Sequence, residues 1–109
     1  MCWVVALDIM WSDPTADDGA DALDEFGFSH NTRGDCVVSF SSRAVNCFLA
    51  AHGYDLLIRA HQEKVLGLKL SKSARVLTIF SSSNYQGGGN SAGCALVAPD
   101  GNIHLVLQN

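Results

Sequence analysis

Two short apolar runs in the chain stop abruptly at residues that can carry chemistry. Residues 57–60 run into His61, and residues 75–80 break into a polar segment that leads to Tyr85. Apolar runs of this length, bounded by polar residues, are typical of buried β-strands. We therefore expect strands at 55–60 and 75–80, with a short strand near 65–70, and we expect the first two strands to direct their functional ends toward one place.

The strongest helical pattern lies in the middle of the chain. Four residues recur at the i, i+3, i+4 and i+7 spacing of one helix face: Val45, Phe48, Leu49 and His52. Ser42 is a typical residue at a helix start and Gly53 is typical just past a helix end. The sequence thus predicts a helix over 43–52. We interpret His52 as structural rather than as a metal ligand, because a cation is favoured at a helix C-terminus.

The last segment of the chain has the pattern of a β-hairpin. Pro99-Asp100-Gly101 is a turn signal between two apolar segments at 93–98 and 102–107. Ile103, Leu105 and Leu107 alternate with more polar residues, so we expect them to form a buried face, with His104 on the wetter face. This position makes His104 a poor candidate for a metal ligand.

An acidic segment precedes the helix. Residues 15–25 contain five carboxylates together with Gly and Ala, without a sustained period. A calcium loop is one interpretation, but the Asp, Asn and Gly positions of an EF-hand loop do not align here. The pattern therefore favours a solvated surface loop.

Composition excludes several classes of protein. Hydrophobic residues make up 48% of the chain and charged residues 17%, as in a globular domain. Seven Lys and Arg and a formal net charge of −4 argue against a general nucleic-acid surface. Residues 1–10 are too short for a membrane span and lack a basic segment, so we expect neither an anchor nor a signal peptide. The four cysteines show no C-x-x-C spacing, which favours buried reduced thiols over disulfides or a zinc site.

Four phrases follow one another along the chain: Trp11-Ser12-Asp13-Pro14, Asn31-Thr32-Arg33-Gly34, Arg59-Ala60-His61 and Asn84-Tyr85. In this order the chain resembles, from about residue 8 to residue 107, the C-terminal part of the catalytic domain of the metal-dependent serine/threonine protein phosphatases. This is the phosphoprotein phosphatase family that includes calcineurin.

The resemblance implies an α+β fold of mixed helices and strands, the C-terminal part of a calcineurin-like metallophosphoesterase β-sandwich flanked by helices. Residues 1–109 would form an incomplete C-terminal portion of the catalytic domain, in which residues 1–10 are a buried strand leading to the tryptophan.

The resemblance also assigns roles to site residues. Arg33 would clamp the substrate phosphate, because a planar guanidinium grips two phosphate oxygens at once. Tyr85 would overlook the metals and contact phosphate. Asp13 would lie near the substrate groove, although fixing the turn before Pro14 is an equally good interpretation. His61 would supply one metal ligand, whereas a lone histidine is otherwise more often structural.

The family's Gly-Asp-x-His, Gly-Asp-x-x-Asp-Arg-Gly and Gly-Asn-His-Glu motifs do not occur in these residues. The complete domain would hold two metal ions (Mn, Fe or Zn), with His61 contributing to one of them. A single imidazole does not hold a dinuclear centre, so we expect the chain by itself to be inactive.

Two functions remain open. The first is a phosphoserine/phosphothreonine protein phosphatase, a hydrolase acting on phosphoprotein substrates in the cytoplasm or nucleus, with regulatory subunits or peptides as partners and no binding to nucleic acid or membrane. The alternative is a truncated pseudophosphatase that acts as a binding module for regulatory peptides. Its apolar docking surface would include Leu68, Leu70, Leu96 and Ile103.

Overall fold

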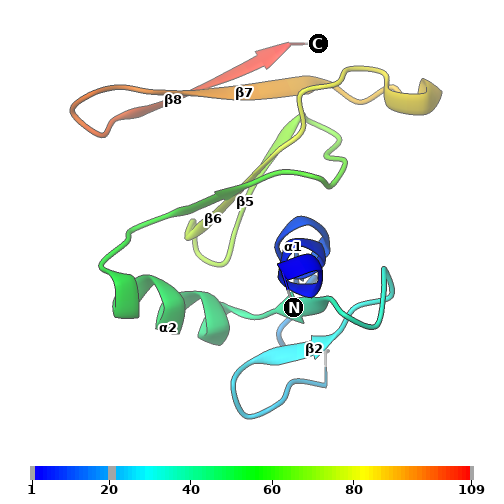
Figure 1. Ribbon diagram of the computed structural model, residues 1–109. Helices are drawn as coiled ribbons and strands as arrows, with labels where there is room; N and C mark the ends of the chain where they lie inside the picture. Colours follow the sequence, from blue (N-terminus) through cyan, green and yellow to red (C-terminus); the bar gives the residue numbers. More distant parts are fainter. Residues whose placement is uncertain (1, 20–21, 109) are drawn as a thin grey trace. The chain divides into compact units, whose positions relative to one another are not determined.

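The computed structural model describes residues 2–19 and 22–108 (Figure 1). These residues divide into two compact units. The first is drawn from Met1–Leu57 and Ser71–Val76, and the second from Ile58–Leu70 and Leu77–Asn109. Helices and short strands occur together, which confirms the predicted mixed α+β class.

The first unit contains a small sheet that the sequence did not reveal. Its strands are β1 (Asp13–Pro14), β2 (Phe28–His30) and β3 (Val38–Phe40), in the order β1-β3-β2. β1 is parallel to β3, whereas β2 is antiparallel to β3 with Ser29 opposite Ser39. Strands of two or three residues are too short to show a period in the sequence, which explains why they were missed.

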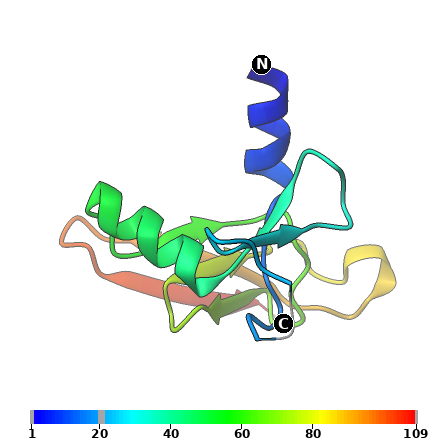
Figure 2. The ribbon, with the colours of Figure 1, turned by 90° about the horizontal axis from the view of Figure 1, so that it is seen from below.

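The N-terminal segment is a helix, α1 (Cys2–Trp11), so the prediction of a buried strand there is wrong. Val5 is 54% exposed and Ile9 is 77% exposed, and Figure 2 shows α1 extending away from the other elements of its unit. A helix satisfies its backbone hydrogen bonds within its own segment, whereas a strand needs a paired neighbour. In the helices of the described residues, no apolar stretch is long enough to cross a membrane.

The predicted central helix is present as α2 (Ser42–His52). It begins one residue earlier than expected, because Ser41 is the N-cap and its side chain accepts a hydrogen bond from the Ala44 N–H. Gly53 adopts a left-handed conformation with φ 69° and closes the helix through a bond from its N–H to the Leu49 carbonyl. Gly53 is confirmed at the C-terminal end, whereas the capping serine at the N-terminal end is Ser41 and not the predicted Ser42.

The core of the first unit forms along the buried side of α2. Val45, Leu49 and Val76 pack together, with the half-buried Phe40 and Leu57 against them. At the edge of this face, Phe48 is 47% exposed and forms ring contacts with His52 and Tyr54. The predicted apolar stripe is therefore only partly buried.

A lysine binds the acidic segment to the turn between two strands. Lys72 is 7% exposed at its side chain and donates to the carboxylate of Asp18 and to the hydroxyl of Thr15. Asp18 also accepts a bond from the Ser42 N–H. Partial burial by itself raises the pKa of Asp18, but the bonds from Lys72, Thr15 and Ser42 outweigh burial and lower that pKa far below its usual range. The prediction of a solvated acidic loop is thus wrong at Asp18.

A second sheet has the order β4-β6-β5, with β4 (Leu57–Arg59), β5 (Leu68–Ser71) and β6 (Val76–Ile79). All three strands lie within one to three residues of their predicted bounds. β6 is buried at Val76, Leu77 and Thr78, as expected. β4 is less buried than expected, because Ile58 is 43% exposed.

The predicted hairpin is confirmed. β7 (Ala92–Val97) and β8 (Ile103–Gln108) are antiparallel, with Leu96 opposite His104. The expected burial of one face is wrong, since Leu105 is 43% exposed and Leu107 is 52% exposed. Alternation predicts which residues share a face of a strand, but another element must cover that face to bury it.

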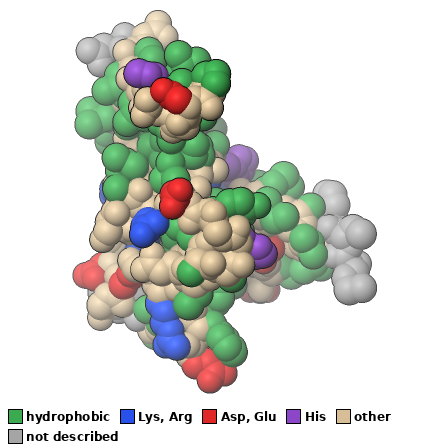
Figure 3. All heavy atoms as spheres, turned by 90° about the vertical axis from the view of Figure 1, so that its left-hand side faces the viewer, with side chains coloured by type: hydrophobic (Ala, Val, Ile, Leu, Met, Phe, Trp, Pro, Cys, Tyr) green, Lys and Arg blue, Asp and Glu red, His purple; other side chains and the backbone are tan. Residues whose placement is uncertain are grey.

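Apolar side chains reach the surface in both units. Figure 3 shows hydrophobic side chains across much of the displayed face, with only scattered charged groups among them. Cys36, Cys47 and Cys94 are free and exposed, so the predicted burial of the thiols is wrong for these three residues.

Candidate functional site

The turn between β2 and β3 presents Arg33 on the surface of the first unit. Its Nη1 atom forms an ion pair with Asp13 Oδ1 at 2.8 Å, and its side chain is 28% exposed. The guanidinium carbon lies 4.8 Å from the centre of the Trp11 ring, a cation–π contact. The guanidinium is thus oriented by a charge on one side and a ring on another.

Asp13 divides its carboxylate between two partners. The Oδ1 atom binds Arg33, while the Oδ2 atom accepts a hydrogen bond from Asn31 Nδ2 at 3.1 Å. Asp13 is only 7% exposed, and its backbone pairs with Ser39 of β3. The structure therefore gives Asp13 a contact with Arg33 that neither interpretation of this residue had included.

Tyr85 lies in a tightly bonded loop after β6. It begins the short 3-10 helix η1 (Tyr85–Gly87), is 41% exposed and packs edge-on against Phe80 with ring centres 5.1 Å apart. The loop closes around Asn90, which is 5% exposed. Asn90 Oδ1 accepts the Tyr85 N–H at 2.7 Å and Nδ2 donates to the Ser82 carbonyl at 2.7 Å.

His61 follows β4 by two residues and has a left-handed backbone with φ 71°. Such a conformation costs a non-glycine residue about 1–2 kcal/mol and is enriched at functional sites. Beside it, Arg59 Nη1 donates to Gln62 Oε1 at 3.0 Å and to Thr78 Oγ1 at 3.2 Å. These two hydrogen bonds hold the segment that carries His61 in place.

The side chains do not form a complete metal centre by themselves. Within 2–19 and 22–108, no group of three His, Cys, Asp or Glu side chains is placed to hold an ion. The described residues therefore do not fit a metal centre without further ligands, and the role of His61 as one ligand stays a prediction.

The structure brings together two of the four predicted site residues, Asp13 and Arg33. They belong to the first unit, whereas His61 and Tyr85 belong to the second. Their convergence on one site stays a prediction.

The sequence is similar to that of serine/threonine protein phosphatases. Over 94 residues it is 34% identical to serine/threonine-protein phosphatase BSL2 of Arabidopsis thaliana. Over 105 residues it is 35% identical to serine/threonine-protein phosphatase with EF-hands 2 of Mus musculus. The resemblance to serine/threonine phosphatases is confirmed. No family model matches the chain.

The chain corresponds to a small part of these phosphatases. The two alignments cover 86% and 95% of this chain but only 9% and 13% of the relatives. The fold matches that of a protein serine/threonine phosphatase from Saccharomyces cerevisiae, which has similarity to human phosphatase PP5. The TM-score is 0.74 at 22% identity, over 90% of this chain and 31% of that one. At this identity the match shows a shared fold.

The sequence did not reveal that two buried asparagines, Asn31 and Asn90, hold the loops that carry Arg33 and Tyr85. Asn31 appears in the sequence as part of the Asn31-Thr32-Arg33-Gly34 phrase, and Asn90 follows the glycines at 87–89 without belonging to any of the four phrases. Their burial, at 4% and 5% exposed, is the feature that separates them from ordinary loop asparagines. In the sequence, the feature that points to these two asparagines is that each lies within a few positions of Arg33 or Tyr85.

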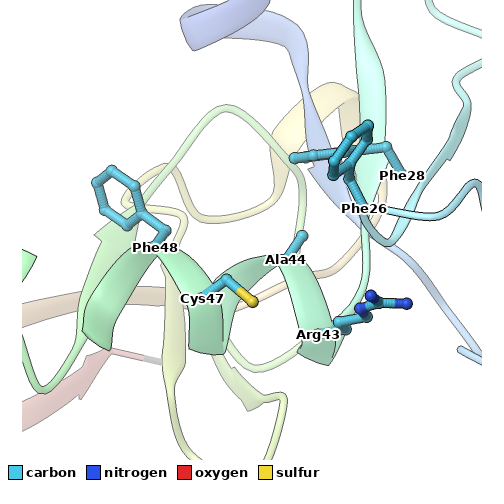
Figure 4. A pocket seen from close by; sticks show the side chains of 6 residues that line it. All are labelled: Phe26, Phe28, Arg43, Ala44, Cys47 and Phe48. Carbon is cyan, nitrogen blue, oxygen red and sulfur yellow. The ribbon is translucent and has the colours of Figure 1, made fainter. Parts of the chain in front are cut away.

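The structure also contains a hollow that the sequence did not suggest. It has a volume of about 380 Å³ and lies along α2 in the first unit (Figure 4). Its lining residues are Phe26, Phe28, Arg43, Ala44, Cys47 and Phe48. Because Arg43 is the one charged group among these six, the hollow offers apolar contacts rather than a set of polar groups that could orient a phosphate ester.

Proposed function

We propose that the chain is the C-terminal part of the catalytic domain of a phosphoserine/phosphothreonine protein phosphatase, which hydrolyses phosphate monoesters. The sequence similarity to serine/threonine phosphatases, over at least 86% of the chain, supports this function. The observation that carries the proposal is the geometry of Arg33, whose side chain is 28% exposed and whose guanidinium contacts Asp13 and the Trp11 ring.

In this function Arg33 binds the phosphate group of the substrate. A guanidinium is always charged and matches two phosphate oxygens, so it stabilises negative charge on the transferring group. Because Asp13 and Trp11 orient Arg33 before substrate arrives, less side-chain entropy is lost on binding. Tyr85, held by its loop, donates its phenolic O–H to a phosphate oxygen.

The complete domain would hold two metal ions (Mn, Fe or Zn), with His61 as a ligand of one. Such ions supply Lewis-acid chemistry to phosphate ester hydrolysis when they are bound. Because the described residues lack a complete ligand set, we expect the 109-residue chain to need further ligands for activity. Phosphoproteins would be its substrates and regulatory subunits or peptides its partners, in the cytoplasm or nucleus.

A binding module is the second candidate, a pseudophosphatase that docks regulatory peptides. The observation that favours it is apolar exposure in the second unit, where Leu70 is 48% exposed and Leu96 is 63% exposed. Among the four residues expected to form this surface, Leu68 and Ile103 are half-buried.

The roles of Arg33 and His61 are tested in a polypeptide that contains this chain and the rest of a phosphatase catalytic domain. Arg33→Ala should lower kcat/KM by about 10²–10³ and leave bound metal unchanged, as expected for loss of one charge-stabilising donor. His61→Ala should lower bound metal, measured by elemental analysis, and activity in parallel. Arg43→Ala is the control, an exposed arginine on α2 that should leave activity unchanged.

Two results would contradict these assignments. If His61→Ala retains two metal ions per chain, His61 is not a ligand. If Arg33→Ala and Arg43→Ala have the same small effect on kcat/KM, Arg33 does not bind the phosphate.

An activity assay on the 109-residue chain by itself tests a third possibility, that the chain is an active enzyme without further ligands. We expect it to hydrolyse a phosphopeptide no faster than a buffer control containing Mn²⁺. Turnover well above that control, lost in His61→Ala, would show that the ligand set is complete within the chain.

A further inference from the structure

We propose that Asn31 is the positioning residue for Arg33, and that it fixes the guanidinium through both ends of the arginine. The proposal deepens the proposed function and rests on it for the role of Arg33 in phosphate binding. Asn31 itself acts through its neighbours, and nothing in the argument requires it to touch the substrate.

The contacts of Asn31 join three segments of the first unit. Its Nδ2 atom donates its two hydrogens to Asp13 Oδ2 and to the Val38 carbonyl, both at 3.1 Å, and lies 3.5 Å from the Trp11 carbonyl oxygen. Its Oδ1 atom accepts the Arg33 N–H at 2.9 Å. The residue is 4% exposed, so water does not readily replace these partners.

The first route to Arg33 runs through the side chain of Asp13. A carboxylate bound at one oxygen alone can rotate, but Asp13 is held at Oδ2 by Asn31 while its Oδ1 binds Arg33 Nη1 at 2.8 Å. The direction of the ion pair therefore depends on the amide of Asn31. The backbone carbonyl of Trp11 lies 3.5 Å from the same amide nitrogen, and the Trp11 ring lies 4.8 Å from the guanidinium carbon.

The second route runs through the backbone of Arg33. The bond from its N–H to Asn31 Oδ1 closes the turn at the residue that carries the guanidinium. A local bond of this kind, from an Asn side chain to the N–H two residues on, sets a turn in loops. The backbone and the charged end of Arg33 are thus set by opposite ends of one amide.

Only an amide of this size meets both demands. It offers two donor hydrogens and an acceptor oxygen, whereas a carboxylate has no hydrogen to donate and an aliphatic side chain has neither. With Asp at position 31, two carboxylates would face each other in a buried site, and the Val38 carbonyl would lose its donor. Asn31→Asp keeps the shape of the side chain, removes the donor function and adds a negative charge.

The test uses the 109-residue chain and solution NMR. In the wild-type chain, the Arg33 side-chain protons should be shifted upfield by the Trp11 ring 4.8 Å away, and the Asn31 side-chain amide should exchange slowly with solvent. In Asn31→Asp, we expect the Arg33 shifts to return toward those of an unstructured arginine. Inorganic phosphate, used as the probe, should bind about tenfold more weakly, as for loss of one oriented hydrogen bond to a charged group.

Asn46→Asp is the matched control, because it makes the same charge change at an exposed position of α2. It should leave the Arg33 shifts and the phosphate affinity unchanged. If Asn31→Asp keeps the Arg33 shifts of the wild type, the proposal is overturned. If that variant does not fold, the wild-type chain decides: an Asn31 amide that exchanges as fast as the Asn46 amide would equally overturn it.

The outcomes separate this proposal from the proposed function. A wild-type chain that shows no response of Arg33 to phosphate, combined with loss of the Arg33 shifts in Asn31→Asp, supports the positioning role and contradicts phosphate binding by Arg33. Phosphate binding that is lost in Arg33→Ala but unchanged in Asn31→Asp supports the function and contradicts the positioning role.

Discussion

Gly67 is a position where a single added carbon should strongly disturb the second unit. It has a left-handed backbone with φ 79° and lies just before β5. A Cβ atom there would be 2.3 Å from the Ala92 carbonyl carbon and 2.4 Å from the Gly93 nitrogen. Both neighbours are backbone atoms, so no change of rotamer can relieve the contact, and the strands themselves must shift.

The magnitude follows from two separate penalties. A left-handed backbone costs an alanine roughly 1 kcal/mol, and forcing an extra carbon into a closely packed site costs about 1–3 kcal/mol. We therefore expect Gly67→Ala to lower the free energy of unfolding by about 3 kcal/mol. Gly101→Ala is the matched control, because Gly101 has φ 86° but an added Cβ meets no atom within 4 Å. In Gly101→Ala the free energy of unfolding should fall by only about 1 kcal/mol.

The assay is urea and thermal unfolding of both variants, followed by circular dichroism. A difference of about 2 kcal/mol corresponds to midpoints roughly 10 °C apart for a chain of this size. The Gly67 carbonyl also accepts the Phe80 N–H at 2.9 Å, and the Phe80 carbonyl accepts the Gly93 N–H at 2.9 Å. A shift at Gly67 should thus reach the Tyr85 loop and move the Tyr85 resonances. If the two variants are equally destabilised, the close approach of the backbones is not what makes glycine necessary at position 67.

Two further predictions concern the first unit. Asp18→Asn leaves the buried ammonium of Lys72 without its charge partner, so we expect the free energy of unfolding, measured in urea at pH 7, to fall by about 2 kcal/mol. This loss is smaller than that for a fully buried pair because the Asp18 side chain is 32% exposed. Since the folded-state pKa of Asp18 is lowered, its stabilisation is present above about pH 4 and is lost as the pH falls toward that lower pKa. The wild type should lose stability over this acid range, and Asp18→Asn should lose less; parallel acid profiles would contradict the ion pair. Ser41→Ala removes the N-cap of α2 and should lower the unfolding free energy by about 1 kcal/mol, whereas Ser42→Ala, one residue inside the helix, should lower it less; equal losses would show that Ser41 does not cap the helix.

The sequence by itself determined the elements whose signals are local. α2 was predicted because its apolar residues recur at the helical period and because serine and glycine flank it. The hairpin of β7 and β8 was predicted because Pro99 and Gly101 mark a turn between two apolar segments. The resemblance to serine/threonine phosphatases was equally a property of the sequence, and the similarity to curated phosphatases confirmed it.

The tertiary structure decided how the candidate site is held. Asp13 and Arg33 are 20 positions apart in the sequence, Asn31 reaches back to Asp13 over 18, and Lys72 binds Asp18 over 54. No period or spacing predicts such partners, because they depend on the path of the chain between them.

Local sequence patterns also did not predict the burial of the strand residues or the helical conformation of α1. The alternation at Leu105 and Leu107 correctly indicated a strand, but both residues are exposed because no described element covers them. The apolar segment Cys2–Trp11 forms a helix rather than a strand. A local pattern determines which residues share a face, whereas pairing and burial depend on the neighbours that the tertiary structure provides.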